Sequence, residues 1–466
     1  MHFSTLAVAA LPLVANAIPS LSSRQTATKI TVDLNKKYQT MDGFGFSEAF
    51  QRANLIVNMP EPKRRALLDL FFSTTTGAGF SILRNGLGSS PDSSSDHMNT
   101  ILPKSPGAAT ATPNYVWDGK DSGQFWVSQQ AVTYGVKQFY ANAWSAPGFM
   151  KSNGNDANGG TLKDEWKQAY ANYLIKYISY YIDAGIPITH LGFLNEPDFT
   201  ASYASMLSNG AQAAAFMKVL RPSLDAANMS QVQIVCCENT GWQQTNSMYS
   251  ALKNAGGDQY LGVVSSHEYT SRSSGSLSST KKGWQTEYSD LNGGWTTSWY
   301  SNGGSGEGLT WAQTVYSGIV NSNLSAYIYW VGTQGGNTNE KLVQADATSY
   351  TVSKRLWALA QYSRTVRPGA VRVGTSGGNF KTTAFKNVDG SVAVNVINTG
   401  TSAATLTVAV TGFVPKNATS WLTDSKNDFT GTALTVASDG SVGGSVPARA
   451  MLSFVLAPAA VGNRTV

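Results

Sequence analysis

The sequence predicts an α/β fold, a (β/α)₈ TIM barrel with an attached β-sandwich domain. Three observations predict it. Eight short apolar runs alternate with helical patterns, the composition changes after Arg367-Pro368-Gly369, and a strand-like segment precedes the first run. The length of 466 residues suits one large domain and a smaller one.

The predicted barrel strands are apolar runs of similar length at irregular intervals. They cover residues 42–47, 81–85, 138–144, 190–195, 231–237, 263–269, 283–288 and 326–331. The clearest helix covers 164–184, where aromatic and aliphatic residues recur at helical spacing and Gly185 with Pro187 ends the pattern. We interpret that stripe as packing against the barrel. Further helices are predicted at 211–227 and 310–322.

The C-terminal part has a different pattern. Residues 367–458 consist of short alternating runs such as "GSVAVNVIN" and "ATLTVAVTG", split by Gly, Asn, Asp and Ser, which predicts a β-sandwich. The segment 26–41 contains the strand-like "ATKITVDL" and is expected to pair with that sandwich. The barrel would then span 42–366, and 459–466 would form a tail.

The composition narrows the class of ligand. Charged residues make up only 13% of the chain, aromatic residues make up 11%, and the net charge is +6. Lys and Arg are scattered and form no long run, which argues against nucleic-acid binding. A polar, weakly charged and aromatic-rich protein is typical of one that handles neutral, hydroxyl-bearing ligands.

The N-terminus indicates export. Residues 1–17 contain an apolar stretch at 6–14 and a small-x-small pattern, Ala15-Asn16-Ala17, and a short propeptide could extend to about 25. No later run approaches the ~18 apolar residues of a membrane span. We therefore expect a secreted, extracellular, monomeric glycoprotein without a membrane anchor. Four sequons are the glycosylation candidates: Asn228, Asn323, Asn417 and Asn463.

Cysteine and histidine are too sparse to indicate a metal site or a cofactor. The only cysteines, Cys236 and Cys237, are adjacent, and ordinary disulfide geometry does not fit neighbours, so they are predicted to be two buried thiols. The chain has four histidines and no His/Cys spacing typical of metal binding. His267 is therefore expected to form hydrogen bonds beside Tyr269.

Two glutamates stand at the ends of predicted strands. Glu196 closes the fourth run in "HLGFLNEPDF", and Glu287 closes the seventh in "GWQTEYS". Glu196 alone could be a solvated loop residue, with Pro197 as the strand breaker. Because barrel strands end at one shared mouth, however, the pair is suited to glycosidic cleavage, in which one carboxylic acid protonates the leaving oxygen and a second carboxylate attacks the anomeric carbon or activates water.

Several motifs resemble those of glycoside hydrolase family 30, in clan A. They are "DGFGFSEAF", "NAWSAPGFMKSNG", "LNEPDF", "SSHEY" and "TEYS", together with the sandwich, and the resemblance runs over residues 31–458. The details are most similar to the fungal xylanase subfamily 7, which includes glucuronoxylanases and xylobiohydrolases. The resemblance implies a retaining mechanism with Glu196 as the acid/base and Glu287 as the nucleophile.

Other residues are expected around this pair. Asn195 can hydrogen-bond a sugar 2-hydroxyl. By family analogy, Arg84 and Tyr269 donate hydrogen bonds that keep Glu287 ionised. Trp144 and Trp330 offer flat apolar faces to a pyranose ring, with core packing as the alternative for Trp330.

Substrate selection depends on loops. Bacterial glucuronoxylanases of the family bind the glucuronate group with an arginine after the eighth strand, but here that loop reads "VGTQGGNTNEKLV". Arg52 is the nearest other cation, and capping of the next helical turn is its alternative role. The long loop 86–123 contains Asn99, which is predicted to close the non-reducing side of the cleft and favour disaccharide release.

The sequence therefore predicts a secreted retaining endo-β-1,4-xylanase that acts on plant cell-wall xylan, with β-1,6-glucanase or β-1,6-galactanase activity as the alternatives within the family. A non-catalytic carbohydrate-binding protein is a further alternative. Its expected signature is the loss of one catalytic carboxylate, and both are present.

Overall fold

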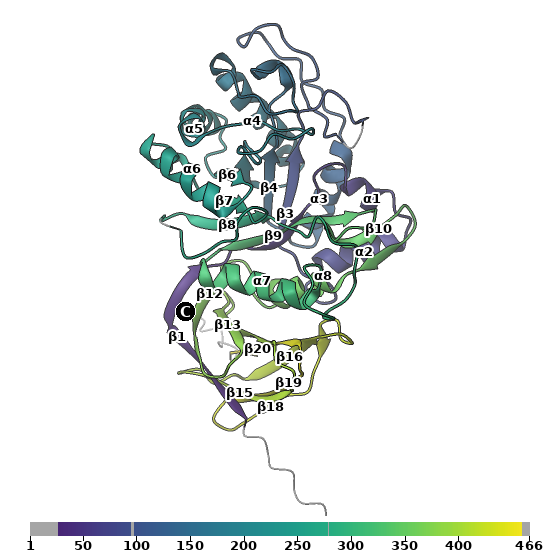
Figure 1. The fold of residues 1–466 in the computed structure, drawn as a ribbon, viewed down its shortest axis with the longest axis vertical. Helices are drawn as coiled ribbons and strands as arrows, with labels where there is room; N and C mark the ends of the chain where they lie inside the picture. The colour runs from purple at the N-terminus through teal and green to yellow at the C-terminus, as the bar shows by residue number, and fades with distance from the viewer. Residues whose placement is uncertain (1–26, 95–96, 278, 459–466) are drawn as a thin grey trace, which may run out of the picture.

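The computed structural model describes residues 27–94, 97–277 and 279–458. The expected signal at 1–17, the propeptide, the tail at 459–466 and the sequon at Asn463 lie outside the described residues. The described strands form two ten-stranded sheets, one built around a closed parallel barrel and the other forming the second domain (Figure 1). The predicted fold class is confirmed.

Each barrel strand overlaps one of the eight predicted runs. The strands are β2 (Gly43–Ser47), β3 (Ile82–Leu87), β4 (Gln138–Ala143), β5 (Ile188–Gly192), β6 (Gln233–Asn239), β7 (Val263–His267), β8 (Lys282–Glu287) and β9 (Ala326–Gln334). β5 begins and ends earlier than its predicted run of 190–195. All neighbours are parallel, and β9 closes the barrel by pairing with both β2 and β8. Two short strands, β10 (Lys341–Ala345) and β11 (Tyr350–Val352), extend the sheet beyond β9.

Helices surround the barrel, and the three helices predicted from the sequence are present. The helices are α1 (Ala53–Val57), α2 (Lys63–Phe72), α3 (Gln124–Thr133), α4 (Lys167–Asp183), α5 (Gly210–Ala226), α6 (Trp242–Asn254), α7 (Gly308–Asn321) and α8 (Lys354–Ser363). Among the described residues, no helix has both the length and the apolar character needed to cross a membrane.

The second sheet has strands from both ends of the chain. Its members are β1 (Thr28–Thr40), β12 (Val371–Ser376), β13 (Lys381–Lys386), β14 (Val392–Asn398), β15 (Ala404–Val410), β16 (Asn417–Thr423), β17 (Thr430–Gly431), β18 (Thr435–Val436), β19 (Val442–Val446) and β20 (Ala450–Ala457). β1 pairs antiparallel with β12 and parallel with β15. Figure 1 shows α7 and α8 between the barrel and this sheet.

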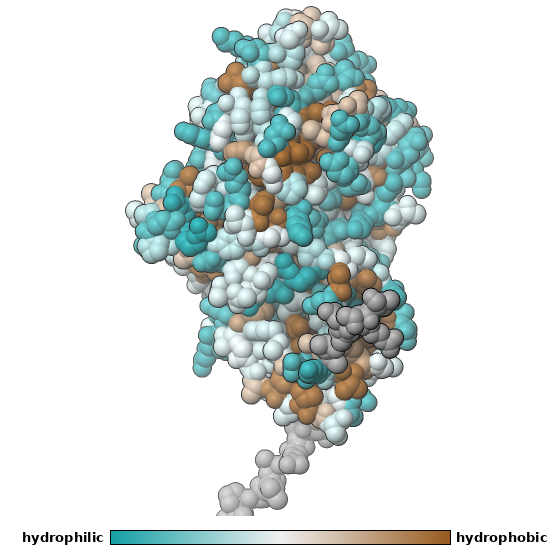
Figure 2. All heavy atoms as spheres, turned by 180° about the vertical axis from the view of Figure 1, so that it is seen from behind, coloured by the Kyte–Doolittle hydropathy of each residue, from teal (hydrophilic) through white to brown (hydrophobic). Residues whose placement is uncertain are grey.

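The two domains are packed together. One hydrophobic core cluster contains barrel residues and the sandwich residues Phe385 and Met451. Trp299 Nε1 donates to the carbonyl oxygen of Arg449 at 2.6 Å, which ties the loop after β8 to the sandwich. The rear face is mostly hydrophilic or weakly polar, with hydrophobic side chains in separate patches (Figure 2).

The prediction of two free thiols is wrong. Cys236 and Cys237 are buried on β6 and are joined by a disulfide. The prediction applied the geometry of bridges between residues distant in sequence, whereas these two residues form the bridge across a cis peptide bond, with their Cα atoms 2.9 Å apart.

Candidate active site

The carboxyl ends of the barrel strands open into a cleft of about 700 Å³. Six residues predicted from the sequence line it: Arg52, Trp144, Glu196, Tyr269, Glu287 and Trp330. Three others, Arg84, Asn195 and His267, lie buried and contact the two glutamates or their partners. The structure thus brings together nearly all of the predicted site residues.

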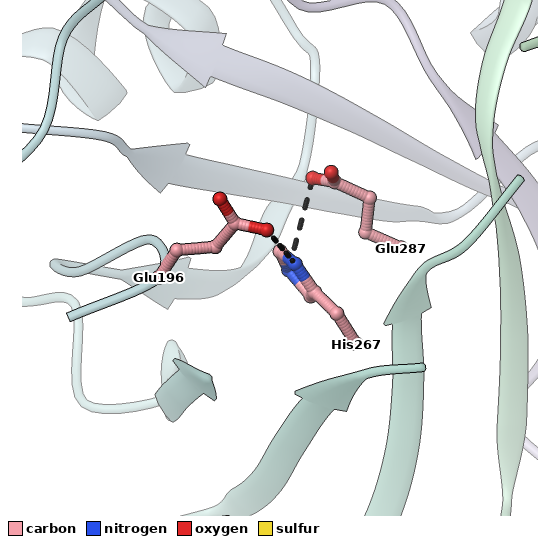
Figure 3. A group of neighbouring side chains, drawn as sticks. All are labelled: Glu196, His267 and Glu287. Atoms are coloured by element: carbon pink, nitrogen blue, oxygen red, sulfur yellow. Dashed lines mark hydrogen bonds and ion pairs between the residues drawn. The ribbon is translucent and has the colours of Figure 1, made fainter. Parts of the chain in front are cut away.

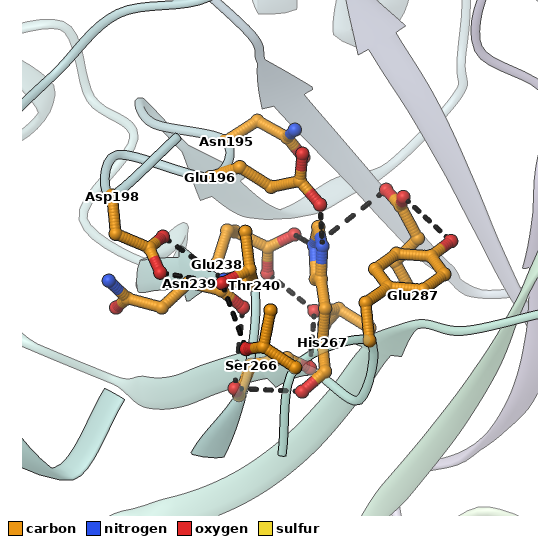
Figure 4. A network of polar contacts seen from close by, with 12 residues as sticks. Asn195, Glu196, Asp198, Glu238, Asn239, Thr240, Ser266, His267 and Glu287 are labelled. Atoms are coloured by element: carbon orange, nitrogen blue, oxygen red, sulfur yellow. Dashed lines mark hydrogen bonds and ion pairs between the residues drawn. The ribbon is translucent and has the colours of Figure 1, made fainter. Parts of the chain in front are cut away.

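Glu196 follows β5 and is held on both its backbone and its side chain. Its side chain is buried and its φ is 46°, while its N–H donates to the carbonyl oxygen of Glu238 at 2.8 Å. Nearby, Thr240 donates from its N–H and its hydroxyl to Asp198, which ties the loop after β5 to the end of β6 (Figure 4). The alternative interpretation of Glu196 as a solvated loop residue does not fit this burial.

Glu287 ends β8 on the other side of the cleft. Arg84 Nη1 donates to its Oε2 at 2.6 Å, and the Tyr269 hydroxyl donates to its Oε1 at 3.1 Å. Burial raises the pKa of Glu287, the charges of His267 and Arg84 oppose that rise, and the charge of Glu196 adds to it. One carboxylate oxygen each of Glu196 and Glu287 and a ring nitrogen of His267 lie within 4.8 Å of one another (Figure 3).

Arg84 lies in the middle of β3, whose six residues are all buried, and it contacts three acceptors. Besides Glu287, its Nη2 donates to Asn195 Oδ1 at 2.8 Å and to Glu238 Oε2 at 2.6 Å. Its guanidinium lies over the ring of Trp144, 4.5 Å from the centroid. Burial alone would lower the pKa of Arg84, but the carboxylates of Glu238 and Glu287 outweigh it, so the side chain is a fixed cation.

His267 ends β7 between the carboxylates. Its Nδ1 is 3.1 Å from Glu196 Oε1, and its Nε2 is 3.1 Å from Glu238 Oε2. Burial lowers the pKa of His267, but the surrounding carboxylates of Glu287, Glu196 and Glu238 outweigh it and raise the pKa to about 10. Both ring nitrogens thus face carboxylate oxygens, an arrangement that favours the imidazolium, a cation that can donate from both nitrogens. Because this cation and Arg84 already supply positive charge here, we propose no metal ion.

Glu238, on β6, is the site residue that sequence reasoning missed. It is fully buried, and Thr286 Oγ1 donates to its Oε1 at 2.6 Å. Burial raises the pKa of Glu238, but Arg84 and His267 outweigh it and lower the pKa to about 2. The signal was the one that identified Glu196 and Glu287, a carboxylate at a strand end, but the fifth run was taken to stop at Cys237.

Aromatic side chains that sequence reasoning also missed form part of the cleft wall. Phe50 meets Trp144 and Tyr203 edge-on, with ring centroids 5.4 and 5.6 Å away. The Tyr203 hydroxyl donates to Glu196 Oε2 at 3.2 Å. Trp330 is largely buried and still lines the cleft, so it serves both as packing and as a wall.

Two loop residues differ in their placement. Arg52 lines the cleft, its Nη1 donates to the carbonyl oxygen of Phe50 at 2.6 Å, and its side chain makes no capping hydrogen bond to α1. Asn99 is half-buried and its backbone forms a bridge with Ser90. Of the described residues in that loop, His97 lines the cleft and Asn99 does not.

The described sequons differ in access. Asn228, after α5, and Asn417, at the start of β16, are exposed. Asn323 is half-buried, and its side chain donates to Ser276 Oγ and accepts from Arg372 Nη2, at 2.6 and 2.7 Å.

Comparisons with known proteins match both the barrel and the sandwich. Residues 41–364 match the model of Glycosyl hydrolase family 59, and residues 369–454 match the Glycosyl hydrolase family 30 beta sandwich domain. The catalytic domain of GH30 xylanase C from Talaromyces cellulolyticus is 41% identical, with a TM-score of 0.86 over 92% of this chain and 99% of that one.

More distant relatives have other named activities. An endo-1,6-beta-D-glucanase of Aspergillus fumigatus is 25% identical over 78% of this chain and 79% of that protein. Glucuronoxylanase XynC of Bacillus subtilis is 23% identical over 71% of this chain and 76% of that protein. Because the xylanase C structure spans barrel and sandwich together at 41% identity, whereas each family model matches one domain, the chain belongs to glycoside hydrolase family 30, as its motifs predicted.

Proposed function

We propose that this glycoside hydrolase cleaves β-1,4-xylosidic bonds in xylan and glucuronoxylan with retention of configuration. The observation that carries the mechanism is the approach of Glu196 and Glu287, whose nearest oxygens lie within 4.8 Å in the cleft. Retaining enzymes hold their carboxyl groups about 5–5.5 Å apart, whereas inverting enzymes need roughly 6.5–9.5 Å to admit a water molecule.

In the first step, Glu287 attacks the anomeric carbon while the bond to the leaving oxygen breaks. Glu196 gives its proton to that oxygen, and a glycosyl ester forms on Glu287. Arg84 and Tyr269 hold the two oxygens of Glu287, which fixes the direction of attack.

In the second step, the Glu196 carboxylate takes a proton from water as the water oxygen attacks the anomeric carbon. The ester bond breaks, and Glu287 leaves as a carboxylate. Arg84 donates to the side-chain oxygen Oδ1 of Asn195, so the NH₂ group of that side chain is left to donate to a sugar 2-hydroxyl.

Xylan as substrate is supported by the 41% identical xylanase C domain and by the aromatic walls of the cleft. Trp144 and Trp330 offer apolar faces to pyranose rings. Arg52 is the cation in the cleft wall that we propose for a glucuronate carboxylate, in place of the arginine absent from the loop after β9.

A β-1,6-glucanase is the second candidate, because the Aspergillus fumigatus relative carries that name and aligns over most of both chains. Its mechanism would use the same two glutamates. The two candidates differ only in which glycan fits the cleft.

Product analysis separates these candidates. The protein would be incubated with glucuronoxylan, linear xylooligosaccharides and a β-1,6-glucan, and the products identified by mass spectrometry. Xylose-based products are expected, with glucuronate at a fixed position if Arg52 binds it. Activity on the glucan alone would overturn xylan as the substrate and leave the mechanism standing.

Azide rescue tests the two carboxylate roles separately. With an activated aryl glycoside, Glu196→Ala plus azide should give a glycosyl azide of retained configuration, because the glycosyl-enzyme still forms. Glu287→Ala plus azide should give the inverted azide by direct displacement. Glu268→Ala is the matched control, since Glu268 is buried on Arg272 and Tyr327 and does not line the cleft. Exchanged products would mean exchanged roles.

A further inference from the structure

Glu238 lies beneath the cleft rather than in its wall. It is fully buried and is absent from the cleft lining, so it cannot touch a bound sugar in this arrangement. Even so, both of its carboxylate oxygens are occupied. Thr286 donates to Oε1, and Arg84 donates to Oε2 at 2.6 Å. His267 also donates to Oε2, at 3.1 Å (Figure 4).

A single oxygen of Glu238 therefore joins the two halves of the site. Arg84, on one side of it, holds the nucleophile Glu287. His267, on the other side, holds the acid/base Glu196. The backbone adds a second link, since the carbonyl oxygen of Glu238 accepts the N–H of Glu196. A small movement of Glu238 would thus change the positions of both reacting carboxyl groups.

The charges also balance around this residue. The pKa directions make Arg84 and His267 cations and Glu238 an anion. With Glu287 as the ionised nucleophile and Glu196 as the protonated acid, the roles proposed above, the cluster is neutral. In a buried cluster, removing one negative charge favours the loss of a proton from a neighbouring group. Without the Glu238 charge, the cluster should release a proton at lower pH.

The other groups facing the cluster do not replace Glu238. The hydroxyl of Tyr140, on β4, donates to Asn142 Oδ1 at 2.9 Å, and burial raises the pKa of Tyr140 well above its usual value. Tyr269 and Tyr203 face the cluster from the cleft wall, and burial raises the pKa of both. All three phenols therefore stay neutral and cannot balance the positive charges.

We propose that Glu238 is a positioning residue that fixes Arg84 and His267 relative to each other. Its buried negative charge also keeps in the site the proton that the acid/base Glu196 delivers. The proposal rests on the roles proposed above for Glu196 and Glu287. The test must separate the effect of losing the Glu238 charge from a loss of fold, because a buried residue with several partners also contributes to packing.

The test compares three folded variants by their pH profiles. For Glu238→Gln, which removes the charge, we expect kcat/KM at the optimum to fall about tenfold or more and the alkaline limb to move to lower pH by about one unit. Glu238→Asp keeps the charge at a greater distance, so its rate should fall while its alkaline limb stays closer to that of the wild type. Glu268→Gln, a buried glutamate outside the cluster, should leave the limb in place.

A substrate-free measurement accompanies the kinetics. The chain has four histidines, so the ¹⁵N spectrum of histidine-labelled protein is simple, and His267→Gln assigns the relevant signals. Wild-type His267 should be doubly protonated at pH 7. If Glu238→Gln does not fold, Thr286→Val takes its place, because it removes one hydrogen-bond donor to Glu238. The less stabilised charge of Glu238 should then raise the pKa of the neighbouring groups and move the alkaline limb to higher pH, opposite to the shift expected for Glu238→Gln.

Two results would overturn the proposal: a folded Glu238→Gln protein with an unchanged alkaline limb, or a wild-type His267 that is neutral at pH 7. An unchanged limb in Thr286→Val would do so where Glu238→Gln is unfolded. Wild-type protein inactive on every glycan would instead count against the proposed function, and the His267 spectrum would still decide the charge of the cluster.

Discussion

Arg84 is the side chain on which most of the proposed site geometry converges. Its guanidinium reaches Glu287, Asn195 and Glu238 at the same time and lies against Trp144. A planar guanidinium can satisfy several acceptors in fixed directions, whereas a lysine ammonium acts as a compact point charge. The position therefore needs an arginine and not simply a cation.

Arg84→Lys tests this requirement. We expect kcat on xylan to fall on the order of 100-fold, because the nucleophile and Asn195 lose their common support. Tyr269→Phe, which removes a single hydrogen bond to Glu287, is the comparison and should lose less activity. The measurement is steady-state kinetics on protein shown to be folded by circular dichroism. Equal losses in the two variants would contradict a special role for the guanidinium.

Arg52 is the residue whose substitution should change substrate preference. Arg52→Ala is expected to reduce kcat/KM on glucuronoxylan about tenfold more than on linear xylooligosaccharides, because only the first substrate carries a carboxylate. Lys63→Ala is a control that also removes a cation, since Lys63 is exposed, donates to the carbonyl oxygen of Thr348 and does not line the cleft. An equal loss of kcat/KM on both xylan substrates would mean that Arg52 does not bind the glucuronate carboxylate.

At the scale of elements, α4 does more than cover the barrel. Its tyrosines were predicted to pack on the strands, but their hydroxyls also hold the long loop after β3. Tyr177 and Tyr181 donate to the buried carboxylate of Asp121, and Tyr173 bonds Thr100 at 2.8 Å. The segment that carries His97 into the cleft is thus fastened to a helix on the outside of the barrel.

Asp121, which attaches the loop after β3 to α4, makes the free energy of unfolding depend on pH. Burial raises the pKa of Asp121 to about 6, against the opposing hydrogen bonds from Tyr177 and Tyr181. The folded protein therefore binds more protons than the unfolded chain between about pH 4 and 6, and the free energy of unfolding falls as pH rises through that window. Asp121→Asn cannot ionise and should escape a penalty on the order of 3 kcal/mol.

Chemical denaturation of both proteins from pH 4 to 7 checks this prediction. The stability of Asp121→Asn relative to the wild type should rise across the window and level off above about pH 6. Asp258→Asn is a control, because Asp258 accepts a tyrosine hydroxyl outside this loop. A difference that does not change with pH would show that the folded protein does not raise the pKa of Asp121.

The strands and long helices could be predicted because their apolar periodicity is local. β5 is a short apolar run with Glu196 in the loop that follows it, β8 ends on Glu287, and the stripe on α4 repeats at helical spacing. The rim of the cleft could not be predicted in this way. Phe50 and Gln51 have φ values of 57° and 62°, a backbone conformation that no periodic pattern specifies, and it decides which side chains enter the cleft.

At the scale of the whole molecule, the barrel and the sandwich should unfold together. The shared core cluster includes Phe385 and Met451, and Gln361 on α8 donates to Thr423 at 2.8 Å. Met451→Ala should therefore destabilise the whole protein by about 2–5 kcal/mol.

Differential scanning calorimetry is the measurement for this prediction. We expect one transition in the wild type and one in Met451→Ala, shifted to lower temperature. A chain ending at residue 366 should not fold, because it exposes the apolar faces that α7 and α8 turn toward the sandwich. Two separate transitions, with only one of them moved by the substitution, would contradict this coupling.

The pairing of β1 has a consequence during synthesis. β1 leaves the ribosome before any barrel strand, yet its two neighbours, β12 and β15, are made only after the barrel is complete. A strand with free edges is a template for association with other chains. The nascent protein must therefore carry this unpaired strand through nearly the whole of translation, and its edges stay open to association until the last domain emerges.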